Sequence, residues 1–364
     1  MFSSREKISM RQAIIIFLMF VHTSSMRLIP TYAASKGERA GWLTPILAIL
    51  PFLCLLYIIQ ALFKNDKNSN LSLSDIIFKT FGRFFGTVLL ILYLIWMMIS
   101  LGLYVRYFAE RLLSTMLPNT PLNFFIITIL IVVFYCLRGG FVYVIRTVEF
   151  LFLTFSIVLI SLFLFTLPNI KVTNLFPVTH YDIWPIIKGS YSIISIWSTF
   201  TFTFFFGDKI NDKEHIKRFG LQATAYLVIT TLMILIQTIG VYGYSVISRV
   251  FMPYIFVIKS ISILISIERL ESIIIASWVI VDFATISLYI YIVISIIKSL
   301  FSLEETKSLI SPVIIFAFIF SQYFAKNRFE LERFSNYISL PLNIIFGFFV
   351  PLFILIVGKL RKQI

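Results

Sequence analysis

Ten long stretches with almost no charged residues constrain this chain more than any other feature of its sequence. A bilayer hydrocarbon core of about 30 Å requires about 20 apolar residues in a helix. Most of the stretches reach that length, and one of them is interrupted only by Asp282. The sequence therefore predicts about ten transmembrane helices. They lie in Gln12–Met26, Ala40–Phe63, Phe84–Val105, Leu112–Leu137, Phe150–Ile170, Gly189–Gly207, Phe219–Ser248, Ser272–Ile297, Ser308–Ala325 and Phe334–Gly358.

The continuous character of these stretches selects helices over a membrane-spanning barrel. A backbone exposed to lipid must satisfy its own hydrogen bonds, so only helices and closed barrels cross the bilayer. A barrel would show segments of about ten residues with alternating polarity. These stretches are long and uniformly apolar, and Phe alone accounts for 40 residues. The expected fold class is an all-α integral membrane protein.

The charge distribution excludes several classes of protein. The net charge is +14, but the basic residues flank apolar spans, where they set topology and meet lipid headgroups, so no nucleic-acid binding is expected. Cys54 and Cys136 lie inside apolar stretches and predict neither a disulfide nor a metal site. His22, His180 and His215 are far apart, and no catalytic or cofactor-binding motif is present. We therefore expect no enzyme, no cofactor and no metal ion.

The distribution of Lys and Arg predicts that both termini are cytoplasmic. With ten spans and that orientation, most of the 31 basic residues fall in cytoplasmic segments. The loops Lys64–Arg83 and Asp208–Arg218 carry four basic residues each and should be cytoplasmic. Val250–Ile267 is either an eleventh span or a helix at the outer mouth. We favour the mouth, because Lys259 would be costly near mid-membrane.

Two of the ten stretches are short, and they are the first and the sixth. Many transporters contain two inverted five-helix repeats whose first helices are broken at the binding site. The positions of Gln12–Met26 and Gly189–Gly207 match that pattern. We therefore predict a five-plus-five inverted repeat with broken first and sixth helices, the first repeat over about 8–168 and the second over about 184–358.

Both short stretches are rich in hydroxyl side chains. Broken helices expose backbone groups that bind small polar ligands, and nearby hydroxyls complete such a site. The alternative is that these hydroxyls bond carbonyls of their own helix or hold neighbouring helices together. The candidate ligand-binding residues are Thr23, Ser24, Ser25, Ser195, Ser198 and Thr199.

Asp282 is the one acidic residue inside a predicted span. Such residues usually face the interior of the bundle and serve function, although a structural ion pair is the alternative. Its own span holds no Lys or Arg, so a cationic partner would have to come from elsewhere. We favour a neutral or cavity-facing acid that couples ligand binding to helix movement. Glu268 and Glu271, which share a helix face just before this span, are candidates for the same coupling or gating role.

Several short segments carry a family resemblance over nearly the whole chain. The segment Ile8–Gln12 precedes the first apolar run, Gly41–Leu43 opens the second, and Arg138–Gly140 leads into the fifth. The most specific is Ile267–Ser272, followed by Trp278. In order and spacing these segments resemble the B subunits of Ger-type spore germinant receptors, also called spore germination permeases.

The resemblance implies a fold similar to that of amino acid–polyamine–organocation transporters. It also implies a subunit that binds a small nutrient such as an amino acid or nucleoside, acts with A and C subunits, and resides in the spore inner membrane. One departure is that His22–Met26 contains no glycine, where the family usually has a glycine-rich break. The competing hypotheses are an autonomous secondary transporter of amino acids or similar solutes and a scaffold that only holds the A and C subunits.

Overall fold

The computed structural model describes residues 7–64, 70–115, 117–259 and 270–363, apart from the side chains of 270–275. In this part of the chain helices form the whole framework, and the only strand-like pairing is a single parallel bridge between Ile8 and Ile210. The first half comprises α1 (Met10–Gly37), η1 (Glu38–Leu43), α2 (Thr44–Phe63), α3 (Leu73–Thr115), α4 (Leu122–Gly139), α5 (Phe141–Thr166), η2 (Leu167–Asn169), η3 (Val172–Asn174) and η4 (His180–Asp182). The second half comprises α6 (Ile183–Ser198), η5 (Thr199–Lys209), η6 (Lys213–His215), α7 (Ile216–Tyr242), α8 (Tyr244–Ile247), α9 (Pro253–Lys259), α11 (Leu270–Phe301), η7 (Lys307–Leu309), α12 (Ile310–Tyr323), α13 (Arg328–Phe334), η8 (Ser335–Ser339), α14 (Leu340–Ile344), η9 (Ile345–Phe349) and α15 (Val350–Leu360).

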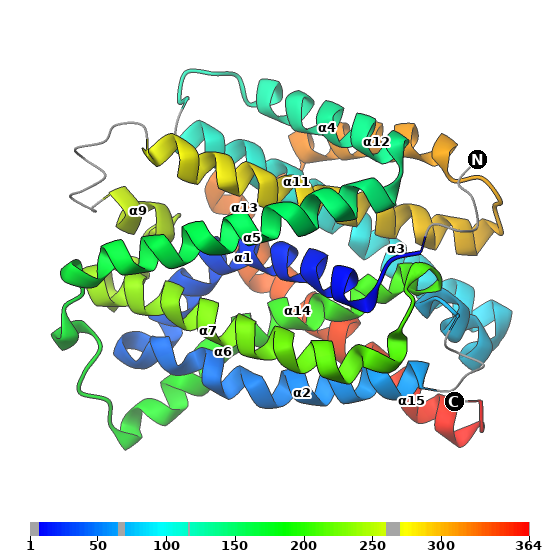
Figure 1. Cartoon of the computed structure of the whole chain (residues 1–364), viewed down its shortest axis with the longest axis horizontal. Coiled ribbons are helices and arrows are strands. Elements are labelled where there is room, and N and C mark those ends of the chain that lie inside the picture. Colours follow the sequence, from blue (N-terminus) through cyan, green and yellow to red (C-terminus); the bar gives the residue numbers. More distant parts are fainter. Residues whose placement is uncertain (1–6, 65–69, 116, 260–269, 364) are drawn as a thin grey trace.

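The long helices lie roughly parallel to one another and form a single bundle (Figure 1). Both chain ends lie at the same end of this bundle, which we call the terminal end; the opposite one is the distal end. By length and composition, seven helical segments of the described residues can cross a membrane, and one of them contains both α1 and α2. With α1 and α2 counted separately, and with the α6–η5 segment and the shorter apolar α12 added, the described chain makes ten helical passes.

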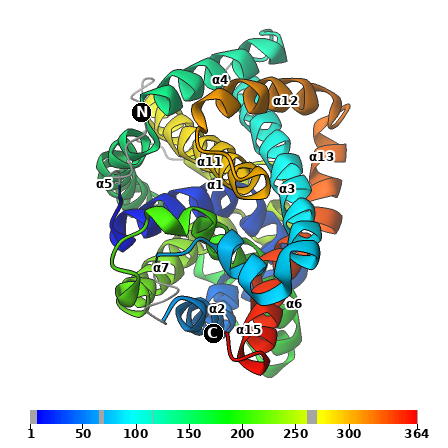
Figure 2. The same cartoon turned by 90° about the vertical axis from the view of Figure 1, so that its right-hand side faces the viewer.

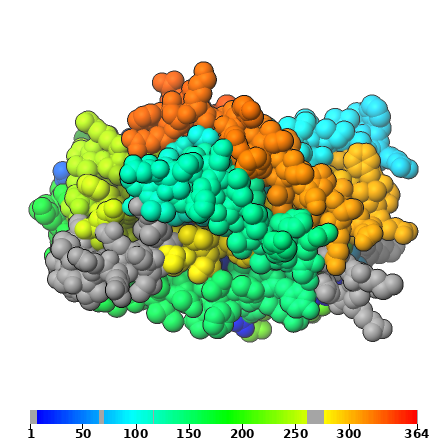
Figure 3. Space-filling view, turned by 90° about the horizontal axis from the view of Figure 1, so that it is seen from above, coloured from blue at the N-terminus to red at the C-terminus, as the bar shows by residue number. Residues whose placement is uncertain are grey.

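Exposed apolar side chains form the lipid-facing surface. On α5, Phe150, Leu153, Ile157, Ile160 and Leu164 recur every three or four residues and are all at least half exposed. That spacing places them along one face of the helix. Figure 3 shows α4, α5 and α12 together on one side of the molecule, and α4 contacts both of the other helices. So large an apolar surface suits a bilayer rather than water, and the chain is a multi-pass membrane protein.

Helix α1 lies in the middle of the bundle, as the end-on view in Figure 2 shows. Every residue from Ala13 to Pro30 is buried, and α1 packs against α5, α6, α7 and α11. Its start is fixed by a capping box, in which the Ser9 hydroxyl accepts a hydrogen bond from the Gln12 amide and the Gln12 side chain accepts one from Ser9. Because α1 has no lipid-facing side, its polar residues can be directed at neighbouring helices.

The expected break in the first helix is absent. Helix α1 stays α-helical from Met10 to Gly37, even across Pro30. The sixth pass does change its winding, because α6 gives way at Ser198 to the tighter 3₁₀ helix η5. The tenth pass alternates between α-helical turns and two wider π-helical turns, η8 and η9.

The third pass also differs from the sequence expectation. Its predicted stretch ended at Val105, but α3 continues to Thr115 and carries Arg106, Glu110 and Arg111 into the interior. At the distal end, α9 covers seven residues of Val250–Ile267 and is too short to span a membrane, whereas residues 260–267 lie outside the described part.

Candidate functional site

A cluster of polar side chains lies between α1, α3 and α11, deep in the bundle. Thr23 of α1 makes a 2.9 Å hydrogen bond with Thr285 of α11, and Ser24 makes one of the same length with Tyr104 of α3. The Ser25 hydroxyl is buried without a hydrogen-bond partner among the described residues. The three α1 hydroxyls are thus turned toward neighbouring side chains or left unpaired, rather than bonded to a broken backbone. We call this cluster the buried centre.

An ion pair crosses the buried centre. The guanidinium of Arg111, near the end of α3, lies 3.0 Å from Oδ1 of Asp282, and both side chains are almost completely buried. Oδ2 of Asp282 has no hydrogen-bond partner in the described part of the chain. The structural ion pair, which was the alternative reading of Asp282, is the one observed, and its cation comes from another helix. The preference for a neutral or cavity-facing Asp282 is not supported, because its carboxylate pairs with Arg111. The sequence had indicated a loop at Arg111.

A second buried arginine lies one helical turn beyond Ser24. The Arg27 side chain packs over the ring of Tyr107, with the guanidinium carbon 3.3 Å from the ring centroid. Such a contact between a cation and the face of an aromatic ring is attractive, most of all where water is excluded. Arg27 is also close enough to Arg111 and Asp282 for their charges to interact. The buried centre therefore contains two cations and one anion.

Aromatic rings separate the buried centre from the terminal end. Tyr104 and Tyr289 stack with their ring centroids 5.1 Å apart, and Phe20 packs against both. Further along α11, Tyr291 stacks on Phe141 with 3.5 Å between ring centroids. Beyond these rings a cavity of about 540 Å³ opens at the terminal end, and charged groups line it (Asp75, Asp208, Lys209, Lys298 and Glu304).

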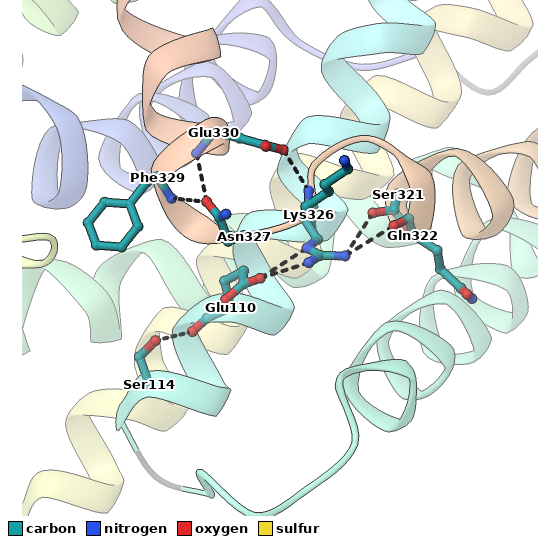
Figure 4. Close-up of polar contacts among 9 residues, drawn as sticks. Glu110, Ser114, Ser321, Gln322, Lys326, Asn327, Phe329 and Glu330 are labelled. Carbon is teal, nitrogen blue, oxygen red and sulfur yellow. Dashed lines mark hydrogen bonds and ion pairs between the residues drawn. The ribbon is translucent and has the colours of Figure 1, made fainter.

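At the distal end, a second ion pair on α3 holds the connection between α12 and α13. Arg106 pairs with Glu110 at 3.0 Å and donates hydrogen bonds to the carbonyls of Ser321 and Gln322. Figure 4 shows Glu110, Ser321 and Gln322 beside the start of α13, where Asn327 caps the helix by accepting from two backbone amides. Each partner thus satisfies the other's charge, and we assign this pair a structural role.

The predicted α6 residues face a different neighbour from those of α1. The hydroxyls of Ser195 and Ser198 donate to the carbonyls of Leu340 and Asn343 in the tenth pass, at 2.8 Å each. The Thr199 hydroxyl bonds the Ile196 carbonyl of its own helix. The structure therefore does not join the six predicted residues in one ring of ligand-facing hydroxyls. Ser195, Ser198 and Thr199 instead follow the alternative, in which hydroxyls bond carbonyls of their own or a neighbouring helix.

Two other predicted residues receive no structural description. Glu268 lies outside the described residues, and Glu271 belongs to the first turn of α11, where side chains are not described. Arg27 and Arg111 were not among the predicted site residues, since Arg27 was given no role and Arg111 fell between two predicted spans. One signal was available: Arg27 lies two positions after the hydroxyl run Thr23–Ser25, with only Met26 between them.

The comparisons with known proteins agree with this architecture. The sequence profile described as "Spore germination protein" matches residues 7–329. Spore germination protein KB of Bacillus subtilis (strain 168) is 24% identical over 99% of this chain and 96% of its own length. Spore germination protein A2 of the same organism is 23% identical over 92% of this chain and 91% of its own length.

Solved structures with the same fold are transporters. A mutant form of the manganese transporter of Eremococcus coleocola has a TM-score of 0.62 at 16% identity, over 94% of this chain and 78% of its own. Mhp1, a nucleobase-cation-symport-1 family transporter solved in a closed conformation with bromovinylhydantoin bound, has a TM-score of 0.55 at 11% identity over the same shares. These similarities confirm the expected fold class, that of helical membrane transporters with inverted repeats; the repeat boundaries stay a prediction.

Proposed function

The chain belongs to the family of spore germination proteins, and we propose that it is the nutrient-sensing membrane subunit of a germinant receptor. In this proposal a small nutrient binds at the buried centre, and its binding triggers germination. The expected partners are an A subunit and a lipoprotein C subunit. The expected location is the spore inner membrane, with the terminal end of the bundle facing the spore core.

One observation carries the proposal. Buried polar groups in proteins are nearly always hydrogen-bonded, and exceptions call for an explanation such as a ligand. At the buried centre, Oδ2 of Asp282 has no hydrogen-bond partner among the described residues, and the same holds for the Ser25 hydroxyl on a different face of α1 from Thr23. A donor of a small ligand would satisfy the Asp282 oxygen, and the ion pair with Arg111 would orient that ligand.

Matched substitutions on the two helices test the proposal in spores. Ser24→Ala and Ser25→Ala should raise the nutrient concentration needed for half-maximal germination at unchanged protein level, because they alter the ligand side of α1. Ser195→Ala should instead lower the amount of protein, since it leaves the Leu340 carbonyl without its donor, at about 1–3 kcal/mol. Spores that lack the chain should lose the nutrient response but keep their response to a nutrient-independent trigger.

Other outcomes would decide against a sensing role at this site. Unchanged nutrient response curves in both α1 variants would place the ligand elsewhere. Uptake of radiolabelled amino acids by proteoliposomes that contain only this chain would favour an autonomous transporter. If the A and C subunits do not purify with the chain from spore membranes, the proposed assembly with these subunits is wrong.

A further inference from the structure

A groove opens on the side of the bundle between the first half of α1, α5 and α7. Figure 1 shows this half of α1, in dark blue, between the other two helices, and all three begin at the terminal end. The groove has a volume of about 630 Å³ and is lined by residues of all three helices. We call it the α1–α5–α7 groove.

The rim of this groove at the terminal end is basic. Arg11 of α1 and Arg146 of α5 line it, and both side chains are exposed. Arg218, at the start of α7, lies beside the same rim, since its guanidinium carbon is 5.8 Å from the centroid of the Phe219 ring in the groove wall. The only acid among the described lining residues is Glu149, which lies 3.9 Å from Arg11. Three guanidinium groups thus accompany one carboxylate, so the rim attracts an anion.

Apolar side chains line the groove below the rim. Ile15 and Leu18 of α1 form its floor, and Phe150 and Leu153 of α5 line one wall with 75% and 65% of their surface exposed. Between Arg11 and Leu18, α1 rises about 10 Å at 1.5 Å per residue. One leaflet contributes about half of a hydrocarbon core of about 30 Å, so the groove reaches through most of a leaflet.

From the basic rim and the apolar floor we infer that the α1–α5–α7 groove binds an anionic phospholipid of the leaflet at the terminal end. The phosphate of the headgroup lies among Arg11, Arg146 and Arg218, and an acyl chain lies along the floor toward Leu18. A guanidinium donates two parallel hydrogen bonds to a phosphate, which makes arginine well suited to such a headgroup. Basic pockets between transmembrane helices on the cytoplasmic side bind anionic headgroups in the same way.

The lining argues against a transmembrane helix of a partner protein as the occupant. Helices that associate within a membrane do so mainly through small residues, which let two backbones approach closely. Among the described residues of the groove, Ala223 is the only small one, and Phe150, Phe152 and Phe219 hold a neighbouring backbone away. A flexible acyl chain can pass between these rings, and a helix cannot.

A lipid in this groove would contact the helix that carries the buried centre. Tyr226 lines the groove, and its ring packs against that of His22 with 5.6 Å between the centroids. His22 directly precedes Thr23, which belongs to the buried centre. The inference adds a lipid site to the proposed function and does not depend on it, and its test uses purified protein, so nutrient sensing and lipid binding can fail separately.

Photocrosslinking with two lipids of different headgroup tests the inference. The full chain is placed in nanodiscs with phosphatidylglycerol or phosphatidylcholine that carries a photoreactive group in one acyl chain, and labelled peptides are mapped by mass spectrometry. Phosphatidylglycerol should label residues 14–18 and 150–153 at least fivefold more than phosphatidylcholine does. The internal control is a groove of about 320 Å³ between α4 and α12, which is lined by apolar residues such as Ile131 and Ile315 and should show no preference.

Substitutions at the rim assign the preference to the arginines. A double variant with Arg11→Gln and Arg146→Gln should lower the preference for phosphatidylglycerol to less than twofold, and it should fold because both side chains are exposed. Arg138→Gln is the matched control. Arg138 is also exposed at the terminal end and lies over an aromatic ring, that of Phe134 at 5.0 Å, but it does not line the groove. Its variant should keep the full preference.

Several results would overturn the inference. Equal labelling of the groove by the two lipids, or an undiminished preference in a double variant that melts at the parental temperature, would each do so. Displacement of phosphatidylglycerol by millimolar glycerol 3-phosphate would assign the rim to a free anion instead. In spore membranes, a photoreactive residue at Leu153 should capture lipid, and capture of a protein would assign the groove to that partner.

Discussion

Loss of the ion pair between Arg111 and Asp282 should destabilise the chain more than any other single change of charge. The two side chains are 6% and 4% exposed and lie 3.0 Å apart. Asp282→Asn keeps the size of the side chain but leaves a buried guanidinium without its anion, close to the charge of Arg27. Removing one partner of a buried pair costs about 3–5 kcal/mol of the free energy of unfolding. At about 1.4 kcal/mol per factor of ten, the folded-to-unfolded ratio should fall by roughly a hundredfold to several thousandfold.

A double-substitution cycle measures this cost. Arg111→Gln, Asp282→Asn and the double variant should be compared for abundance in spore membranes and for apparent melting temperature after purification. The double variant should recover most of the stability lost in either single variant, because no charge is then buried alone. Asp208→Asn is the matched control, since its pair with Lys298 spans 4.0 Å with side chains 36% and 41% exposed, and such pairs contribute about 0–1 kcal/mol.

Germination of the same spores shows whether the carboxylate also serves function. If the double variant is abundant but does not respond to nutrient, Asp282 couples ligand binding to the response, as predicted from the sequence. If it is abundant and responds normally, the pair is structural only. An Asp282→Asn protein with normal abundance and normal melting temperature would refute the electrostatic reasoning altogether.

Two further predictions concern packing and topology. Gly347→Ala should lower the melting temperature and cost about 1–3 kcal/mol of the free energy of unfolding, because the added Cβ would lie 2.5 Å from the Ser198 carbonyl oxygen. The control Gly139→Ala, where a Cβ meets no atom within 4 Å, should leave the melting temperature unchanged. Equal melting temperatures for the two variants would contradict the packing of η9 on α6. A single cysteine at Asn211 should be labelled only from the cytoplasmic side and one at Thr173 only from outside; labelling of both from one side would contradict the proposed orientation.

The apolar stretches predicted most of the fold, because membrane spans are decided by local composition. The ends of the helices were harder to predict. Arg106, Glu110 and Arg111 indicated a loop after Val105, yet they continue α3, because Arg106 pairs with Glu110 and Arg111 with Asp282. Pairing between residues 171 positions apart cannot be deduced from one sequence without knowing which helices are neighbours.

The candidate site was predicted only in part, for a related reason. Hydroxyl-rich segments indicated two broken helices, but a hydroxyl run is compatible with several structures. Thr23 and Ser24 bond side chains on α11 and α3, and no glycine interrupts α1, so its backbone stays helical. Ser195 and Ser198 bond carbonyls of another pass. Which partner a hydroxyl finds depends on the packing of distant helices.

The irregular winding of the tenth pass has a mechanical consequence. Its carbonyls at Leu340, Asn343 and Gly347 accept hydrogen bonds from Ser195, Ser198 and Thr201 in turn. Three such bonds in a dry interior hold the sixth and tenth passes together, because sliding either segment along the other would break all three at once. A displacement of the sixth pass would therefore carry the tenth pass with it.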